Sequence, residues 1–318
     1  MDRLSNHPSF ADAFRRLADI SLNPRRHTAA HAQHHAQLVA AHAVALGRAN
    51  QCSEAELRLL EDLALAHDLG KITGTARPEA SLDVLRDCGI DDPALLALVK
   101  WHDTNLPWYV AATKGQPPSD KAWRRLAAAL DLRLLAIFMV ADRVDAPPGW
   151  RRNAPTAWFL QHARERGLVG DLTLDVPDHP GEVSAGCALV RVHEGARELL
   201  VIRVRAEGYE LPKGGIEWDE LPTEAAARET REEAGISSEL VVGRELGHLD
   251  YLAGADQHRK RVRYFAARVD GPVDFGPLPD RTRERRWLPL ADLAALPLVN
   301  DALRPVLRDA LEGGDAGS

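Results

Sequence analysis

The chain has few cysteines, no long apolar run and no excess of positive charge, and each absence excludes a class of protein. Its three cysteines among 318 residues are odd in number and widely spaced, which excludes a disulfide framework and a cysteine zinc knuckle. No apolar run approaches the roughly 20 residues that a membrane-spanning helix needs, and the first residues lack the pattern of a secretory signal. We therefore expect a cytoplasmic protein without a membrane partner.

The charge balance excludes a general binder of duplex nucleic acid. The net charge of −7 divides into −1 before residue 180 and −6 after it, so neither half is basic. Apolar residues make up 45% of the chain and charged residues 27%, which is typical of a soluble globular protein. At about 150 residues per domain, the length predicts two domains.

The first half has the pattern of a helical bundle. Apolar residues at helical spacing predict helices over residues 29–48 and 132–144. Between them, Ser53 and Glu56 form a capping box that predicts the start of another helix. No strand pattern is convincing in this half. We therefore expect an all-α domain over residues 1–175.

The second half mixes strands and helices. Strand-like runs occupy residues 187–192, 199–204, 240–249, 261–269 and 286–290. Helical patterns cover residues 223–234 and 301–311, and the first of these helices can be capped by Thr223 and ended by Gly235. We therefore expect an α/β domain over residues 176–318.

Three acids on the first of these helices indicate a metal site. Glu229, Glu232 and Glu233 stand at positions i, i+3 and i+4, where like charges repel each other on a free helix. A divalent cation reverses that repulsion, and Mg²⁺ or Mn²⁺ commonly bridges carboxylates to the phosphates of a substrate. The alternative is a solvated acidic helix face.

These acids lie in a stretch that resembles the Nudix box. The box has a glycine, five residues, a glutamate, seven residues, and then Arg-Glu-x-x-Glu-Glu-x-Gly with an aliphatic residue. The matching residues are Gly214, Glu220, Arg228, Glu229, Glu232, Glu233, Gly235 and Ile236. Thr230 departs from the pattern, because an aliphatic residue is commoner there. The resemblance implies a Nudix fold, an α+β sandwich, that hydrolyses a nucleoside diphosphate linked to another group.

The resemblance also implies roles for single residues. The three glutamates and the carbonyl of Gly214 would hold Mg²⁺ or Mn²⁺ and activate the attacking water. Arg228 would orient the glutamates, and Glu220 would brace the loop. Glu284 is a candidate for an extra ligand or base, or equally for a plain surface acid among arginines.

The substrate of this half is suggested by the residues around the glycine pair. The stretch from Leu211 to Gly215, with Tyr251 sixteen residues beyond Gly235, resembles the dinucleoside polyphosphate branch of Nudix enzymes. This resemblance implies that Lys213 and Tyr251 contact the substrate. Four basic residues could neutralise a long phosphate chain, although alternate residues of a strand point to opposite faces. These residues are Arg259, Lys260, Arg261 and Arg263.

Histidine and aspartate are the informative residues of the first half. Seven of the 13 histidines fall between His27 and His102, which favours a metal site of imidazole and carboxylate ligands. His67 and Asp68 are adjacent, so both can ligate one ion only near a helix edge or a distortion. Asp142 interrupts an otherwise apolar helix, where a buried carboxylate is costly unless it is paired or metal-bound.

Together these residues resemble the HD phosphohydrolase superfamily, whose motif order is His, His-Asp and a late Asp. The matching residues over residues 25–165 are His35, His67, Asp68 and Asp142, with His31 and His34 as alternatives for the first ligand. The resemblance implies a helical bundle that binds Mn²⁺, Fe²⁺ or Mg²⁺ and hydrolyses a phosphate ester, with Asp68 in a catalytic role. Dinuclear members of the superfamily often add a His-His pair before the last Asp. No such pair occurs between residues 102 and 142, so the resemblance implies a single metal. His102 is a candidate phosphate contact or further ligand, and Lys71 is a candidate phosphate contact or a solvated lysine.

Three readings of function follow. The first is a bifunctional hydrolase that cleaves a pyrophosphate bond at one site and a nucleotide phosphate ester at the other. The second is an RNA-end processing enzyme with short RNA as its partner, because the stretch from Lys100 to Trp108 resembles HD domains attached to tRNA nucleotidyltransferases. Trp101, Trp108 and Trp123 could stack a base, or they could be core residues of the bundle. The third is a Nudix enzyme with a non-catalytic HD sensor. Oligomeric state is not predicted.

Overall fold

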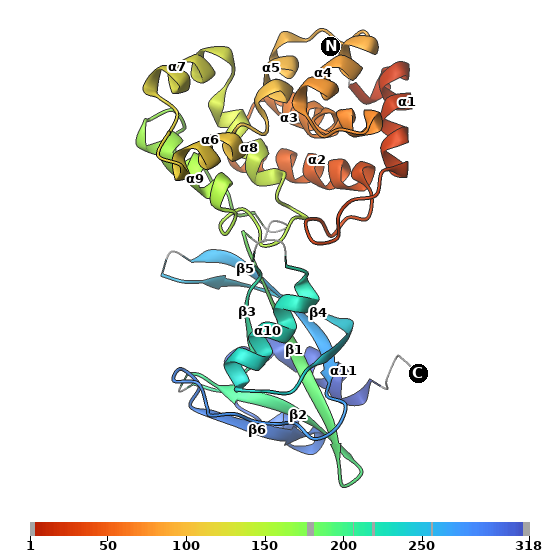
Figure 1. Cartoon of the computed structure of the whole chain (residues 1–318), viewed down its shortest axis with the longest axis vertical. Helices are drawn as coiled ribbons and strands as arrows, with labels where there is room; N and C mark the ends of the chain where they lie inside the picture. The colour runs from red at the N-terminus through yellow and green to blue at the C-terminus, as the bar shows by residue number, and fades with distance from the viewer. Residues whose placement is uncertain (1–3, 177–180, 206, 218–219, 256, 314–318) are drawn as a thin grey trace. The chain divides into compact units, whose positions relative to one another are not determined.

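The computed structural model describes residues 4–176, 181–205, 207–217, 220–255 and 257–313. Figure 1 shows the chain, which divides into two compact units, Met1–Glu182 and Val183–Ser318. The expected domain boundary lies at residue 175, and the extents 1–175 and 176–318 for two functional domains remain our proposal. No helix of the described residues is long and apolar enough to cross a membrane.

The first unit is helical, as the sequence predicts. Its α-helices are α1 (Pro8–Arg16), α2 (Ala32–Ala49), α3 (Glu54–Ala66), α4 (Pro78–Asp87), α5 (Pro93–Trp101), α6 (Asn105–Thr113), α7 (Asp120–Ala129), α8 (Leu132–Ala141) and α9 (Ala154–Glu165). Short 3-10 turns are η1 (Leu4–Asn6), η2 (Leu17–Asp19) and η3 (Leu69–Thr73). The predicted capping box is confirmed, because Ser53 and Glu56 exchange both hydrogen bonds at the start of α3.

Helix α8 runs through the centre of this unit. Every residue from Leu134 to Ala141 is buried, and α2, α3 and α9 pack against the helix. Trp123 is also buried, in ring contact with Trp108 and Phe159, so it belongs to the core rather than to a base-stacking surface. The central position of α8 fixes the place of the residues that directly follow it.

The second unit is a mixed α/β domain built on one sheet. Its strands are β1 (Glu182–His193), β2 (Ala196–Arg203), β3 (Lys213–Gly215), β4 (Val241–Ala253), β5 (His258–Arg268) and β6 (Glu284–Pro289). Its helices are α10 (Pro222–Ala234) and α11 (Arg304–Glu312), with 3-10 turns η4 (Leu290–Ala295) and η5 (Asp301–Leu303). The strand order is β4-β5-β1-β2-β6, and β3 pairs with β1. The sequence did not predict β3, which is short and rich in glycine.

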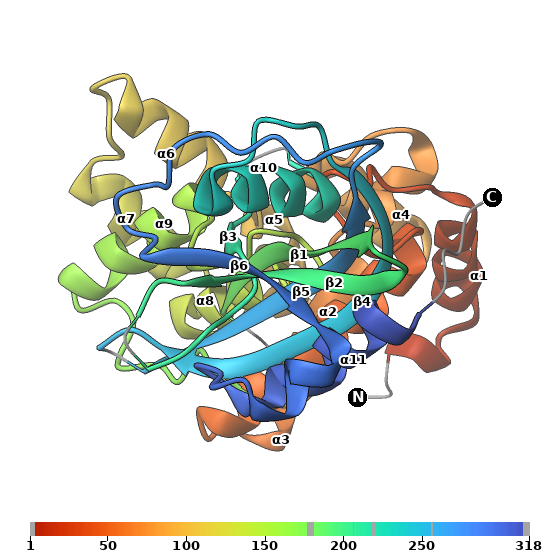
Figure 2. The same cartoon turned by 90° about the horizontal axis from the view of Figure 1, so that it is seen from below.

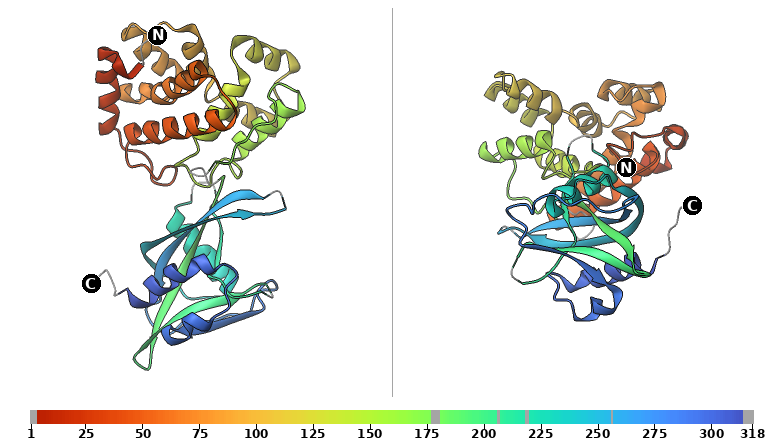
Figure 3. Two further views of the ribbon diagram at one scale, coloured as in Figure 1. Left: turned by 180° about the vertical axis from the view of Figure 1, so that it is seen from behind. Right: turned by 60° about the horizontal axis from the view of Figure 1, so that its bottom comes forward.

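Two helices cover opposite faces of this sheet, as Figures 2 and 3 show. On one face Ala225 and Ala226 of α10 pack among alternate residues of β1 and β2. On the other face Val306 and Leu307 of α11 pack against Val201 and its neighbours. The alternation of strand side chains thus produces two apolar clusters, one under each helix.

The start of α10 differs from our expectation. The N-cap residue is Leu221, and Thr223 lies inside the first turn, so the prediction that Thr223 caps this helix is wrong. Pro222 sets the start, because its fixed φ and missing N–H suit the first helical position. The predicted end is confirmed, since Gly235 adopts a left-handed conformation with φ of 61°. A Cβ at Gly235 would lie 2.5 Å from the carbonyl oxygen of Pro277.

Candidate metal centres

Three helix ends bring the histidine and aspartate residues of the first unit together. His35 lies in the first turn of α2, and Asp142 directly follows α8. His67 and Asp68 directly follow α3, where the chain leaves the helix for the 3-10 turn η3. This break in the helix lets two adjacent side chains reach one point.

The distances within this group suit one small cation. Oδ1 of Asp142 lies 3.3 Å from Nε2 of His35 and 3.3 Å from Nε2 of His67. Oδ2 of Asp68 lies 3.3 Å from Nε2 of His67. One ligand atom each from His35, His67 and Asp68 lies within 4.8 Å of the other two. We call His35, His67, Asp68 and Asp142 the histidine–aspartate cluster.

Hydrogen bonds on the far side of each imidazole turn Nε2 toward the cluster. Nδ1 of His67 donates to the carbonyl oxygen of Ala64 at 2.8 Å, so Nε2 is the ring nitrogen that faces the aspartates. That Nε2 atom is buried and has no hydrogen-bond partner. Nδ1 of His35 lies 2.8 Å from Oδ1 of Asp145. A buried nitrogen without a partner beside two carboxylates fits a transition-metal ion.

The charges within the cluster favour protonated histidines and ionised aspartates. Burial alone would lower the pKa of both histidines, but the neighbouring carboxylates raise the pKa of His35 to about 9 and of His67 to about 10. Burial alone would raise the pKa of the aspartates, but His35 and His67 hold the pKa of Asp68 and Asp142 well below the usual range. Because a metal ligand must be deprotonated, cation binding here would release protons.

Of the other candidate residues of this half, two are exposed and two lie beside the histidine–aspartate cluster. His31 and His34 are exposed, whereas His35 is buried in the cluster. Nζ of Lys71 lies 2.5 Å from Oδ2 of Asp68. The ring of His102 lies 5.3 Å from that of His67, and burial together with the charge on His67 lowers the pKa of His102. The structure thus brings Lys71 and His102 to the border of the cluster.

Sequence reasoning missed Asp145 and His27. The side chain of Asp145 is almost completely buried, and besides His35 it accepts from the backbone N–H of Ala29 at 3.2 Å. Nδ1 of His27 lies 3.4 Å from Oδ1 of Asp145. Asp145 could have been found from the sequence, because it is a second carboxylate in the same apolar stretch, three residues after Asp142.

In the second unit, Arg228 organises the acids of the glycine–glutamate motif. Its guanidinium makes a bidentate pair with Glu220, at 2.8 Å from Nε to Oε1 and 2.9 Å from Nη2 to Oε2. The same group donates to Oε1 of Glu229 at 2.9 Å and to the carbonyl oxygen of Gly215 at 2.9 Å. Arg228 therefore fixes Glu229 and the loop before α10 relative to each other.

The three glutamates of α10 have different surroundings. Glu229 lies against Gly214, where a Cβ would come within 2.0 Å of the carboxylate. Oε2 of Glu233 accepts from the backbone N–H of Lys213 at 2.8 Å, and burial raises the pKa of Glu233. The side chain of Glu232 is 60% exposed. Carboxylate oxygens beside a bare glycine backbone are the donor set that Mg²⁺ or Mn²⁺ prefers.

Among the described residues, the α10 glutamates do not form a group as tight as the histidine–aspartate cluster. The reason is Arg228, whose Nη1 lies 2.9 Å from Glu229 and 3.3 Å from Glu232. The guanidinium occupies the position between these two carboxylates.

The predicted substrate contacts of the second unit have partners within the protein. Nζ of Lys213 lies 2.6 Å from Oε2 of Glu210, an acid that the sequence did not single out. Burial alone would lower the pKa of Lys213, but the charges of Glu210 and of Tyr251, on β4, raise it. Glu284 contacts Tyr209 and Arg203 instead of the α10 glutamates. Its role as a ligand or base stays a prediction.

The basic residues of β5 are in part neutralised. Arg261 makes a bidentate pair with Asp250, and Arg263 makes one with Glu245. These two arginines therefore have less charge to offer a phosphate chain than the sequence alone suggests. The unusual Thr230 has a structural reason, because its hydroxyl accepts from the backbone N–H of Cys187 at 3.0 Å.

Side chains from a distant segment hold the end of α10. The Thr282 hydroxyl donates to the carbonyl oxygen of Glu233 at 2.7 Å. Nη1 of Arg285 donates to the carbonyl oxygens of Ala234 and Gly235 at 2.7 and 3.1 Å. Carbonyls at a helix end have no partner inside the helix, and a cation there is stabilised by the helix dipole. No local sequence pattern indicates these contacts.

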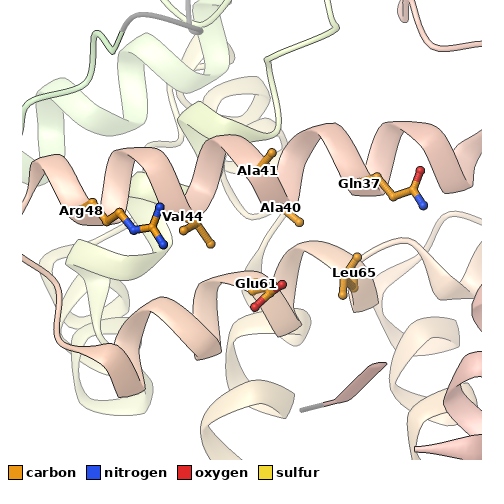
Figure 4. A pocket seen from close by; sticks show the side chains of 7 residues that line it. All are labelled: Gln37, Ala40, Ala41, Val44, Arg48, Glu61 and Leu65. Atoms are coloured by element: carbon orange, nitrogen blue, oxygen red, sulfur yellow. The ribbon is translucent and has the colours of Figure 1, made fainter. Parts of the chain in front are cut away.

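A pocket of about 460 Å³ lies on the outer side of α2 and α3 (Figure 4). Its lining residues are Gln37, Ala40, Ala41, Val44, Arg48, Glu61 and Leu65. None of them belongs to the histidine–aspartate cluster. The pocket is therefore separate from the candidate metal centre.

Two family models match separate parts of this chain. The family model of the HD domain matches residues 30–146, and that of the NUDIX domain matches residues 180–310. An 8-oxo-(d)GTP phosphatase of Mycolicibacterium smegmatis is 40% identical over 117 residues, which are 36% of this chain and 34% of that protein. An RNA pyrophosphohydrolase of Xanthomonas campestris pv. campestris is 40% identical over 77 residues, 24% of this chain and 38% of that protein.

A solved structure of a C. elegans Ap4A hydrolase is 26% identical and covers 40% of this chain and 92% of its own, with a TM-score of 0.34. A chloroplastic Nudix hydrolase 21 of Arabidopsis thaliana is 33% identical and is matched over 63% of its length. The chain therefore spans between about a third and two thirds of the length of the curated relatives it matches. The helical half and the mixed α/β half thus agree with an HD domain followed by a Nudix domain.

Proposed function

This chain joins an N-terminal HD domain to a C-terminal Nudix domain, and on that basis we propose that it is a two-site, metal-dependent hydrolase of nucleotide-linked phosphates. The Nudix site would cleave a pyrophosphate bond, with a dinucleoside polyphosphate-like compound favoured. The HD site would hydrolyse a phosphate ester of a nucleotide. Few, widely spaced cysteines favour action in the cytoplasm.

At the Nudix site, Glu229, Glu232, Glu233 and the Gly214 carbonyl would hold Mg²⁺ or Mn²⁺. A divalent cation supplies charge neutralisation for phosphates and a more acidic water. Arg228 keeps Glu229 aligned, and the backbone N–H of Lys213 keeps Glu233 aligned. The ammonium group of Lys213 adds a positive charge beside these acids.

At the HD site, His35, His67, Asp68 and Asp142 would hold Mn²⁺, Fe²⁺ or Mg²⁺. The observation that carries this half of the proposal is the buried Nε2 of His67, which has no hydrogen-bond partner and lies 3.3 Å from oxygens of both aspartates. Lys71 would neutralise a phosphate next to Asp68. His102, whose pKa is lowered by burial, would contact the substrate beside His67.

The experiment that tests this proposal is product analysis by chromatography. The panel holds dinucleoside polyphosphates, nucleotide sugars, nucleoside mono- and triphosphates and cyclic-phosphate ends, with Mg²⁺ or Mn²⁺. We expect one product series from pyrophosphate cleavage and a second from ester hydrolysis, both abolished by a chelator. Absence of any product across the panel would contradict the proposal.

RNA-end processing is the second candidate, and the RNA pyrophosphohydrolase among the relatives favours it. In that case the Nudix site would trim a 5′ polyphosphate or cap, and the HD site would clear a terminal or cyclic phosphate. The acidic charge of the Nudix half counts against extended RNA but not against a few nucleotides. Short RNA should then compete with nucleotide substrates at micromolar rather than millimolar concentration.

A non-catalytic HD sensor is the third reading. The presence of all four cluster residues, His35, His67, Asp68 and Asp142, around one point counts against it. A sensor would bind a nucleotide at the HD domain without releasing phosphate from any compound of the panel.

A further inference from the structure

A tyrosine whose ring contacts two arginines lies on the segment that leads to Gly214 and takes no part in the hydrolytic roles proposed for the Nudix site. The Cζ atoms of Arg286 and Arg203 lie 5.0 and 5.9 Å from the ring centre of Tyr209. Arg203 ends β2, and Arg286 lies two residues beyond Glu284, the first residue of β6. Glu284 is paired with Arg203 in the sheet, and Arg286 with Val201. We call Tyr209, Arg203, Arg286 and Glu284 the arginine–tyrosine cluster.

The arginine–tyrosine cluster has more positive charge than its own acid can neutralise. Both oxygens of Glu284 are in use, since Oε1 accepts from the Tyr209 hydroxyl at 2.8 Å and Oε2 pairs with Arg203 at 2.7 Å. In the described part of the chain, no acceptor pairs with the guanidinium of Arg286. The Nε atoms of Arg203 and Arg286 are both buried without a hydrogen-bond partner.

This charge contrasts with the rest of the acidic second half. The arginines of β5 have acceptors, namely the carboxylates of Asp250 and Glu245 for Arg261 and Arg263. A buried guanidinium Nε–H without an acceptor is unfavourable, and the oxygens of a phosphate match the donors of a guanidinium. The cluster therefore has the chemistry of an anion site.

The cluster is continuous with the Nudix site along one segment. Glu210 follows Tyr209, and its Oε2 lies 2.6 Å from Nζ of Lys213, whose backbone N–H donates to Glu233. Tyr209 and Leu211 belong to the apolar cluster that α11 covers. Gly214 is five positions beyond Tyr209, and such a segment spans at most about 17 Å. A substrate longer than one nucleotide could therefore reach the cluster from the phosphates beside the α10 glutamates.

We propose that Arg286 and Arg203, stacked on Tyr209, bind a phosphate group of the second nucleotide of a dinucleoside polyphosphate substrate. This inference rests on the proposed pyrophosphate cleavage at the Nudix site. The arginine–tyrosine cluster would then favour substrates with two nucleotides, because a single nucleotide does not reach it.

The test compares diadenosine tetraphosphate with ATP in steady-state kinetics of the full chain. Arg286→Met should raise the KM for diadenosine tetraphosphate at least tenfold and leave its kcat within twofold. Both constants for ATP should stay within twofold. Arg286→Lys, which keeps the charge, should show a smaller rise in KM.

Arg191→Met is the matched control. Its guanidinium also stacks on a ring near β6, 4.2 Å from the centre of Trp287, but it is paired with Glu198. This variant should behave as wild type, and a thermal melt should show that all variants are folded.

The outcomes separate the inference from the function on which it rests. If the wild type cleaves both compounds and Arg286→Met changes neither KM, or both equally, the inference alone fails. A rise in KM seen only with 5′-triphosphate RNA would overturn the assignment to a dinucleoside. If the wild type cleaves none of these compounds, the proposed function fails and the inference with it.

Discussion

Asp145 provides the most quantitative prediction for the HD site. Its carboxylate is almost completely buried and holds Nδ1 of His35 at 2.8 Å, so that Nε2 of His35 points at the cluster. Loss of such an outer partner typically costs about 10–100-fold in metal affinity. We therefore expect Asp145→Ala to weaken Mn²⁺ binding at this site by about that factor. Asp145→Asn, whose amide oxygen can still accept from Nδ1, should weaken it less.

The assay is Mn²⁺ titration by isothermal calorimetry. It is made in a Glu233→Gln background, so that the HD site dominates the signal. Asp83→Asn is the control, because the Asp83 side chain is 72% exposed on α4 and pairs with Arg86 of the same helix. Circular dichroism checks that the variants are folded, since removing one partner of a buried charge pair costs about 3–5 kcal/mol of stability. If folded Asp145→Ala binds Mn²⁺ as tightly as the parent protein, Asp145 does not support metal binding through His35.

Three further predictions concern the Nudix domain. Gly214→Ala should abolish pyrophosphate cleavage in a folded protein, because the new Cβ would displace the Glu229 carboxylate; product chromatography that shows wild-type turnover would contradict this. Burial raises the pKa of the Cys187 thiol to about 12, so the free energy of unfolding should fall above pH 9, by about 1.4 kcal/mol at pH 10, and Cys187→Ala should lack this loss in urea denaturation. Arg285→Met removes the donors at the end of α10, and should raise the Mg²⁺ concentration needed for half-maximal cleavage more than Arg285→Lys does.

The sequence predicts the local parts of both sites well. The glycine–glutamate motif lies within 23 consecutive residues, and its helix, its terminating Gly235 and the neighbouring strands could all be expected from local patterns. The exceptions have local causes too. Pro222, rather than Thr223, sets the start of α10, and β3 is too short to produce a pattern.

Partners that meet only after packing could not be predicted. Asp145 orients His35 across 110 residues of chain, and Arg285 reaches the end of α10 from 50 residues away. Glu284 illustrates the same limit, since nothing in its local sequence indicates that Tyr209 and Arg203 bind it. Such contacts depend on which elements lie side by side, which helical or strand periodicity does not specify.

We propose that this chain carries two independent hydrolytic sites, and one variant at each site separates the two activities. Wild type, Glu233→Gln and Asp68→Ala are compared by chromatography on the same nucleotide panel with Mg²⁺ or Mn²⁺. We expect Glu233→Gln to lose the products of pyrophosphate cleavage and to keep those of ester hydrolysis, and Asp68→Ala to do the reverse. Equal loss of both activities in either folded variant would contradict it.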